Sequence, residues 1–500
     1  MAIKSIFKDN EYIQSNNPDL FYQIEEKPRS VKDAIVYAFQ TVVTMLGPMS
    51  ITPLALAAAC GMTPLQTAQV LGLCMIGSGL GTLCQTTWGV RLPVVQTMSL
   101  AFMAGYISIA GIVTAENGGV VDGKLIMCYI MGAVILGGMV EFLLGVTGLI
   151  TKLKRVFTPV IMGPVMMLIM LSMATTTVGW ASENWFVFLV VAVLTLTMSN
   201  IIPATKWGKD KKIIKSLAII VPIVVGYVIS WVMSANGMID PSSGAYVDIQ
   251  VIKDTPWFNK PGGFVNWGMP KFRLDFLLLV LAGYLMSIIE SIGQYHANTF
   301  ACRCPGKLSQ HRVSMGIGME GLGCILSALA GGLASTSSGE NIGLVERTGV
   351  ASRHIARVGG VLLICLGLIG KFGAVITSIT DPIIAGIFVS ILGVVGGGGL
   401  QTTFSKCPLS GRNVSIFGIA LIFGMGMPAY IAANPVDTGI IWLTNSINGI
   451  CSSNMAIGGI MAILLDQVMP GSDKERGIQE DDTPDAEYGE DTAYGVSIKE

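Results

Sequence analysis

Three glutamates, Glu290, Glu320 and Glu340, stand inside or beside long apolar stretches of this chain. A carboxylate at the depth of a lipid bilayer costs about 2.5–3.5 kcal/mol on insertion scales, so it usually faces a cavity or a partner and marks a substrate or ion path. An ionised carboxylate accepts hydrogen bonds from N–H donors, and a buried one can take up a proton. The acids therefore indicate binding of a small polar molecule or of a proton. Glu141 and Asp466 lie outside any motif, and we interpret them as structural or boundary groups.

The segment around Glu340 allows two interpretations. Glu340 is followed by the amide of Asn341, and either group can bind a polar ligand in a mostly apolar pocket. Alternatively, Glu340 caps a helix N-terminus, where a negative charge is favourable. Four hydroxyl side chains precede it, and they would suit a Na⁺ ion, which needs several oxygen ligands: Ser335, Thr336, Ser337 and Ser338.

The elements that position these groups are membrane spans. With 52% hydrophobic and only 13% charged residues among 500, the chain is too apolar for a soluble globular protein, and we expect an all-α polytopic membrane protein. No basic stripe suggests nucleic acid. A span needs about 20 apolar residues, and fourteen ranges qualify: 34–59, 64–84, 92–112, 125–149, 157–178, 185–204, 213–235, 274–294, 313–332, 338–352, 357–378, 382–400, 412–431 and 440–467.

Spans three and ten are the poorest helices. The third contains Pro93 and the β-favouring pair Val94 and Val95, and the tenth is short and rich in Ser and Gly. Non-helical backbone is tolerated in a membrane only where it is buried in protein or lines a cavity. We therefore expect short broken or extended segments in these two spans.

Two similar openings indicate an internal repeat. Span five opens with the sequence TPVIMG at 158–163, and span twelve opens with DPIIAG at 381–386. These are corresponding positions in two halves of seven spans, and an odd number of spans gives the halves opposite orientations. The sequence thus predicts two inverted seven-span repeats, an arrangement in which the binding site lies between paired broken segments.

Charge asymmetry predicts the orientation. With fourteen spans both termini share a side, and the basic clusters at 27–32, 152–155, 206–215, 303–312, 353–357, 406–412 and 474–476 all fall on it. The positive-inside rule then makes both termini cytoplasmic and places the long loop extracellularly. The polar N-terminal residues lack the apolar core of a signal peptide, so the first apolar segment is expected to be retained.

Two motifs resemble the nucleobase–ascorbate transporter family, also called nucleobase:cation symporter-2, which includes uracil and xanthine permeases. GENIGLVERTG, from Gly339 to Gly349, is similar to the family signature, whose defined places are filled by Glu340, Asn341, Gly343, Thr348 and Gly349. ESIGQ, beginning at Glu290, is similar to the family motif of span eight. The resemblance covers roughly residues 30 to 470.

The resemblance implies a binding site. The substrate-binding set it implies is Glu290, Glu340, Asn341, Ser99, Leu100 and Gly339, and the supporting or proton-coupling set is Glu320, Gln294, Gln40, Thr41 and Thr348. Three positions depart from the family pattern: Thr41 stands where a His is usual, Leu100 where a Phe is usual, and Gln294 where an Asp or His is frequent. Two simpler roles stay open, because Glu290 can snorkel at the cytoplasmic end of its helix and Glu320 can make a purely structural hydrogen bond.

The resemblance also implies a domain plan. Spans 1–4 and 8–11, residues 34–149 and 274–380, would form a core domain; spans 5–7 and 12–14, residues 150–236 and 381–470, would form a gate domain. Residues 1–33 would be a cytoplasmic segment, 237–273 an extracellular loop, and 471–500 a disordered acidic cytoplasmic tail. The resemblance further implies a homodimer that is joined through the gate domains and lies in the cell membrane.

The function that these observations favour is import of a nucleobase, uracil or a xanthine-like or urate-like purine, by elevator-type symport with H⁺. Glu290, with Glu320 next, is the expected proton site, and Na⁺ is the alternative ion. An enzyme is disfavoured because no HExxH motif and no cofactor motif is present. A channel and a fold-related anion exchanger are weaker hypotheses. We expect no cofactor and no metal, and the pair Cys302 and Cys304 is only a weak metal or redox candidate.

Overall fold

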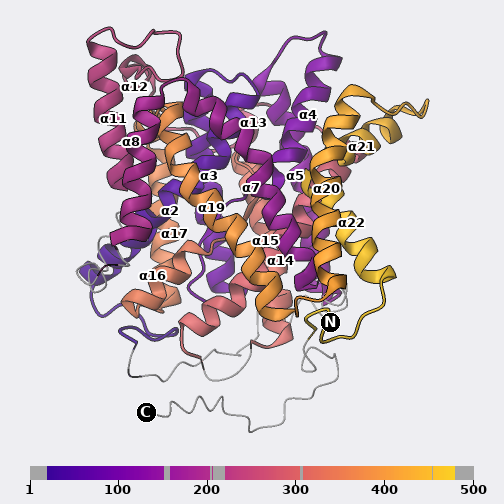
Figure 1. Cartoon of the computed structure of the whole chain (residues 1–500). Coiled ribbons are helices and arrows are strands. Elements are labelled where there is room, and N and C mark those ends of the chain that lie inside the picture. The colour runs from indigo at the N-terminus through magenta and orange to yellow at the C-terminus, as the bar shows by residue number, and fades with distance from the viewer. Residues whose placement is uncertain are drawn as a thin grey trace.

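The computed structural model describes residues 18, 20–150, 158–202, 205, 220–304, 308–452 and 454–478, and it is mostly helical (Figure 1). A helix overlaps each of the fourteen predicted ranges. The longer helices are α2 (Val31–Ala59), α3 (Pro64–Thr87), α4 (Met103–Glu116), α5 (Gly123–Val146), α7 (Pro159–Ser182), α8 (Trp185–Leu196), α11 (Ile220–Ala235), α14 (Leu274–Ala301), α15 (Gln310–Ala330), α16 (Glu340–Thr348), α17 (Arg353–Leu368), α18 (Gly370–Thr377), α19 (Asp381–Lys406), α20 (Gly411–Ala433), α21 (Ile441–Ser452) and α22 (Asn454–Val468).

Length and hydropathy support part of the predicted span count. Among the described residues, seven helices are long and apolar enough to cross a membrane: α2, α3, α5, α7, α14, α15 and α20. The count becomes eight if α18 and α19, which meet at an angle of 80°, form one bent span. Shorter apolar helices cover Leu100–Glu116, Trp185–Ile201, Val221–Ala235 and Ala456–Val468. The arrangement of fourteen spans in two inverted repeats stays a prediction, and parts of it, such as residues 213–219, lie outside the described residues.

The extended segment predicted in span three is confirmed as a short strand, and a second short strand lies directly before the predicted span ten. β1 (Gln96–Met98) and β2 (Ser335–Ser337) pair antiparallel, with Gln96 opposite Ser337, and all six residues are buried. Each strand supplies the backbone partners that the other lacks, which is what non-helical backbone at membrane depth requires. β1 leads through a 3-10 turn (Leu100–Phe102) into α4, and β2 leads into α16.

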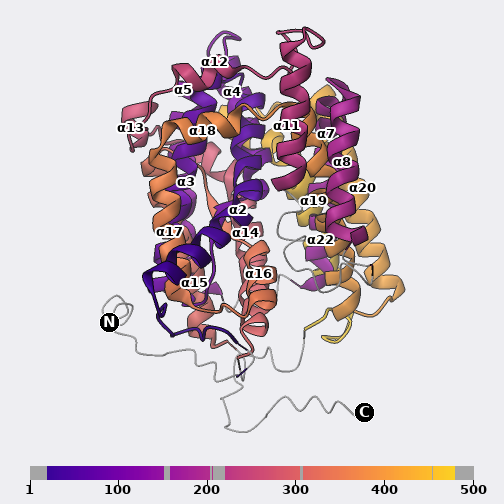
Figure 2. The same ribbon diagram turned by 90° about the vertical axis from the view of Figure 1, so that its left-hand side faces the viewer.

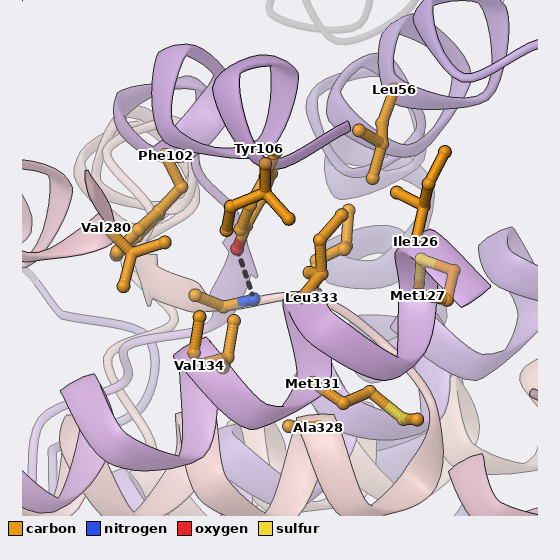
Figure 3. Close-up of a cluster of buried hydrophobic side chains, with 14 of the residues drawn as sticks. Leu56, Phe102, Tyr106, Ile126, Met127, Met131, Val134, Val280, Ala328 and Leu333 are labelled. Carbon is orange, nitrogen blue, oxygen red and sulfur yellow. Dashed lines mark hydrogen bonds between the residues drawn. The ribbon is translucent and has the colours of Figure 1, made fainter. Parts of the chain in front are cut away.

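An apolar cluster fixes β2 against α4. The hydroxyl of Tyr106 on α4 accepts a hydrogen bond of 3.0 Å from the backbone N–H of Ala334, directly before β2. Figure 3 shows this bond beside the side chains of Phe102 and Leu333. Phe102, Tyr106 and Leu333 are all fully buried. The packing of α4 therefore sets where β2 begins.

The helices form two contact groups. One group, here called the core group, contains α2–α5 and α14–α18; the other, here called the gate group, contains α7, α8, α11 and α19–α22. Figure 2 shows α3 and α17 on one side and α7, α8 and α20 on the other. The groups meet where α4 and α14 contact α21, and where Ile51 of α2 packs with Met173 and Phe388 of the gate group. These groups resemble the predicted core and gate domains, whose boundaries stay a prediction.

The two similar openings lie at opposite ends of an antiparallel helix pair. Thr158 and Thr380 are the residues that precede α7 and α19, and a proline follows in the first turn of each helix. A Cβ added to Gly163, in the second turn of α7, would lie 2.7 Å from the backbone O of Gly399, near the end of α19. The two openings therefore have the opposite orientations that an inverted repeat requires.

Glycines let α5 and α15 touch through their backbones. A Cβ added to Gly145 would lie 2.6 Å from the backbone O of Ser314 and closer still to Gly318. Small residues allow such close approach between membrane helices, where packing rather than the hydrophobic effect drives association.

We expect Gly145→Ala to destabilise the protein by about 1–3 kcal/mol, because the added methyl group meets backbone that cannot move aside. The measurement is the thermal unfolding midpoint in detergent. Gly111→Ala on α4 is the matched control, since an added Cβ there meets nothing within 4 Å. Equal midpoints for the two variants would contradict the close packing of α5 on α15.

Residues 20–29, here called the N-terminal strap, lie across the link between α16 and α17. The backbone N–H of Tyr22 donates to Gly349 O at 3.0 Å, and Ala351 N–H donates to Tyr22 O at 3.0 Å. Arg353 forms an ion pair of 2.6 Å with Glu25 of the strap. The strap thus ties the end of α16 to the start of α17.

Candidate functional site

The carboxylate of Glu320 lies at the centre of a buried hydrogen-bond network. Glu320 is fully buried on α15. Five hydroxyl groups donate to it, here called the hydroxyl cradle: Ser287 at 2.6 Å and Thr336 at 3.0 Å to Oε1, and Ser291 at 2.6 Å, Tyr295 at 3.0 Å and Ser337 at 3.1 Å to Oε2. Three elements, α14, α15 and β2, are therefore joined at one carboxylate. Hydrogen bonds to a charged acceptor are stronger than neutral ones, so the cradle holds these elements firmly.

Two buried amides orient the cradle. Gln85 Nε2 donates to the Tyr295 hydroxyl at 2.9 Å, and Gln96 Nε2 donates to the Ser337 hydroxyl at 2.8 Å. Each hydroxyl has one hydrogen, so a hydroxyl that accepts from an amide is free to donate its own hydrogen to Glu320. The arrangement surrounds the carboxyl group of Glu320 with donors.

Glu290 lies on the face of α14 that points to the gate group. Met286, one turn earlier on the same face, packs in a cluster with Val165 and Leu168 of α7. The side chain of Glu290 is exposed, whereas that of the neighbouring Ser291 is buried in the cradle. The cradle thus fixes the rotation of α14 and directs Glu290 out of the core group.

Gln294 and the start of α16 are in direct contact. A Cβ added to Gly339 would lie 2.7 Å from Nε2 of Gln294, and α16 begins at the next residue, Glu340. Gln294 is one turn along α14 from Glu290, so both share a face. The structure therefore brings Gln294 to the start of α16, directly before Glu340, with Glu290 one turn away on the same helix face.

The side chain of Asn341 is held away from the contact between Gln294 and the start of α16. Its side chain is buried, and its Nδ2 donates to the backbone O of Pro93, directly before the extended segment that becomes β1. Asn298 of α14 donates to the same oxygen at 3.5 Å. Asn341 therefore positions the start of α16 relative to β1.

Gln40, Thr41, Asn341 and Thr348 come together on a small pocket between α2 and α16, with a volume of about 10 Å³. This volume has room for about one water molecule and not for a base. The hydroxyl of Thr41 donates to Tyr37 O at 3.0 Å and that of Thr348 to Leu344 O at 2.8 Å, each within its own helix. The four residues thus lie together at the packing surface of α2 on α16.

Ser99 and Leu100 follow β1. The Ser99 hydroxyl accepts a hydrogen bond of 3.1 Å from Ala101 N–H and so caps the turn that begins at Leu100. The side chain of Leu100 is half-buried and packs against the apolar cluster of Figure 3.

A larger cavity lies elsewhere. Its volume is about 190 Å³, and its walls include Met62, Thr67, Trp180 and Asp381, contributed by both helix groups. No predicted site residue lines it. The candidate site is therefore defined by converging polar groups and not by this cavity.

We expect Gly339→Ala to lower uptake of the substrate without unfolding the protein. The added methyl group would displace the amide of Gln294, which is the flexible end of a side chain and can move. The measurement is initial uptake in Gly339→Ala and in the double variant Gly339→Ala, Gln294→Ala, in which the clash is removed. Uptake that is lower still in the double variant would indicate that Gln294 itself contacts the substrate, and unchanged uptake in both would contradict the contact.

Sequence reasoning missed most of the cradle. Glu320, Thr336 and Ser337 were recognised as polar groups, but Ser287, Ser291 and Tyr295 were not, and neither were Gln85 and Gln96. A signal was present: Ser287, Ser291 and Tyr295 recur every four residues, which places three hydroxyls on one face of a membrane helix.

The family model and the related proteins that match this chain are all named as permeases, transporters or solute carriers. Residues 32–433 match the model of the Permease family. The human protein Solute carrier family 23 member 2 is 30% identical over 499 residues, which cover 92% of this chain and 76% of the relative. Nucleobase-ascorbate transporter 1 of Arabidopsis thaliana is 28% identical, with 92% of this chain and 91% of the relative covered. A putative purine permease of Clostridium perfringens is 26% identical, with 93% and 96% covered.

Solved structures support the fold alone. The transmembrane domain of the cyanobacterial bicarbonate transporter BicA aligns with a TM-score of 0.53 and 14% identity over 84% of this chain and 97% of that one. The structure of SLC26A9 aligns with a TM-score of 0.57 and 8% identity over 87% of this chain and 66% of that chain.

Proposed function

Because this chain belongs to the Permease family and is therefore a membrane transporter, we propose that it imports a nucleobase by cation symport. The observation that supports the proposal is the hydroxyl cradle, which fixes β2 beside α14, so that Gln294, one turn along α14 from Glu290, meets Gly339 at the start of α16. Relatives named as nucleobase-ascorbate transporter and as putative purine permease support the substrate class.

The proposed recognition rests on hydrogen-bond acceptors. The ring N–H groups of a uracil-like or xanthine-like edge donate, and ionised carboxylates are acceptors only. Glu290 and Glu340 would accept from the base, and the amide of Gln294 would supply a donor or an acceptor beside them. With Leu100 in place of an aromatic residue, the base would lie against an aliphatic surface.

We propose H⁺ as the coupling ion, with Glu290 as its first binding site. Glu320 is the weaker candidate, since its oxygens already accept five hydrogen bonds that favour the ionised form. Na⁺ is the alternative. Two of the four hydroxyls expected to suit it, those of Thr336 and Ser337, donate to Glu320.

In the proposed transport cycle the core group moves against the gate group. The protein would be a homodimer joined through the gate group. It would lie in the cell membrane with both termini on the cytoplasmic side. The location of Glu290 between the groups supports this proposal. A cysteine pair across α2 and α19 that abolishes uptake when oxidised, and restores it when reduced, would test the movement.

Uptake into cells or vesicles tests the substrate and the ion. We would measure radiolabelled uracil, xanthine, urate and ascorbate, each with competition by the others, under imposed H⁺ or Na⁺ gradients. Saturable uptake of a base driven by an inward H⁺ gradient is the expected result. Accumulation that follows a Na⁺ gradient at constant pH, and that ignores an uncoupler, would overturn the coupling proposal.

A small organic anion is the second candidate substrate, because one relative is named a nucleobase-ascorbate transporter. A helix N-terminus attracts anions, but here α16 begins with Glu340, whose own negative charge opposes an anion. Uptake of ascorbate without uptake of any base would favour this candidate.

A further inference from the structure

The carboxyl group of Glu141 is buried inside the core group without a hydrogen-bond partner in the part of the chain that the structure describes. Its side chain is 1% exposed, and neither oxygen has a partner among the residues that the structure describes. The backbone beside it is pressed against α15, since a Cβ added to Gly321 would lie 2.6 Å from Gly138 O and 3.1 Å from the carbonyl carbon of Glu141. The proposed function gives this acid no role.

Among the described residues, the titratable groups that face Glu141 offer no positive charge. They are Glu320 and Cys324 on α15, and Tyr284 and Tyr295 on α14. An isolated ionised carboxylate loses its hydration on burial, and this loss is compensated only by a counter-charge or by several donors. A second negative charge on the neighbouring Glu320 would add repulsion.

Glu320 and Glu141 differ sharply in their surroundings. Glu320 receives five hydroxyl donors, two of them oriented by amides, and these stabilise a negative charge. Glu141 receives no donor from the described residues. When two neighbouring acids interact, the first proton leaves the site where the charge is better stabilised, which here is Glu320.

We propose that Glu141 is a proton-binding site of the core group, so that the pair of Glu141 and Glu320 carries one negative charge and one proton at neutral pH. The ligand of this site is H⁺. The site is separate from Glu290 and Glu340, and the inference does not depend on which substrate the protein carries. The proton lies one helix away from the cradle, and its loss would place two negative charges beside β2.

Infrared difference spectroscopy on the purified full-length protein tests the proposal directly. The C=O stretching band of a protonated carboxylic acid is separate from the bands of carboxylates and amides. We expect this band in the unmodified protein at neutral pH and its decrease by the contribution of one carboxylic acid in Glu141→Gln, with an unchanged unfolding midpoint, because an amide keeps the volume and the neutral charge. Glu116→Gln is the matched control, since Glu116 is exposed, forms an ion pair of 2.7 Å with Arg273, and should leave the band intact.

Three results would overturn the proposal. They are the absence of the band from the unmodified protein, its persistence at full intensity in Glu141→Gln, and its appearance only after Na⁺ is replaced by choline, which would assign the site to Na⁺. If Glu141→Gln does not fold, Glu141→Asp keeps an acid at the position with one methylene fewer. A displaced acid band in Glu141→Asp would support the site, and an unchanged band would overturn it.

Discussion

Uptake should fall to background in Glu290→Gln and in Glu340→Gln, while both proteins still insert into the membrane. Each change keeps the side-chain volume but adds N–H donors to a group that only accepted. A substrate N–H then loses its acceptor, and an unpaired buried donor costs about 1–3 kcal/mol on each contact. The changes are expected to act on the substrate and not on the fold, because Glu290 is exposed on α14 and Glu340 is the first residue of a short helix.

The measurements are saturable uptake, substrate binding and surface expression. Glu183→Gln is the control, because Glu183 is exposed, accepts a hydrogen bond of 2.8 Å from Ser243, and lies in the gate group. Normal uptake in both site variants would remove Glu290 and Glu340 from the binding site. Lost expression in either one would mean that the carboxylate is structural.

Glu320→Gln should lose stability as well as uptake. Three hydroxyls donate to Oε2 of Glu320. An amide nitrogen in place of Oε2 carries N–H donors itself, so it would face these three donors without accepting from them. Removing one partner from a buried charged network costs about 3–5 kcal/mol. We expect a large decrease in the unfolding midpoint in detergent.

Ser287→Ala is the comparison for Glu320→Gln, because it should lower the stability by a smaller amount. It removes one of the five donors to Glu320, and the expected loss is about 1.5–3 kcal/mol, typical of one hydrogen bond to a charged group. A stable Glu320→Gln protein with lost uptake would contradict the structural role of the cradle and favour Glu320 as a group that acts directly in transport.

The positions of β1 and β2 could be predicted from local sequence. Pro93 and the Val pair after it disfavour helix, and the Ser and Gly residues around β2 do the same. The similar openings of α7 and α19, together with the odd number of spans expected in each half, predicted opposite orientations for these two helices. Each opening and each break is a pattern of neighbouring residues, so the sequence is enough to find it.

The cradle could not be predicted in the same way, because its members are distant in sequence. Tyr295 and Gln85 are 210 residues apart, and Gln96 and Ser337 are 241 apart. Their contact depends on how α3, α14 and β2 pack. Thr41 and Thr348, predicted as supporting or proton-coupling residues, have hydroxyls that donate within their own helices, and their predicted role stays a prediction.

The N-terminal strap has a practical consequence for shortened forms of the protein. A chain that starts at residue 30 would leave Gly349 O without its two strap donors, and Arg353 without the carboxylate of Glu25. The Arg353 guanidinium would keep only its bond to Thr86 O among those that the structure shows. Residues before the first span are often removed for expression, but here the removal would loosen the end of α16, the helix that begins with Glu340. Shortened forms should therefore begin before residue 20.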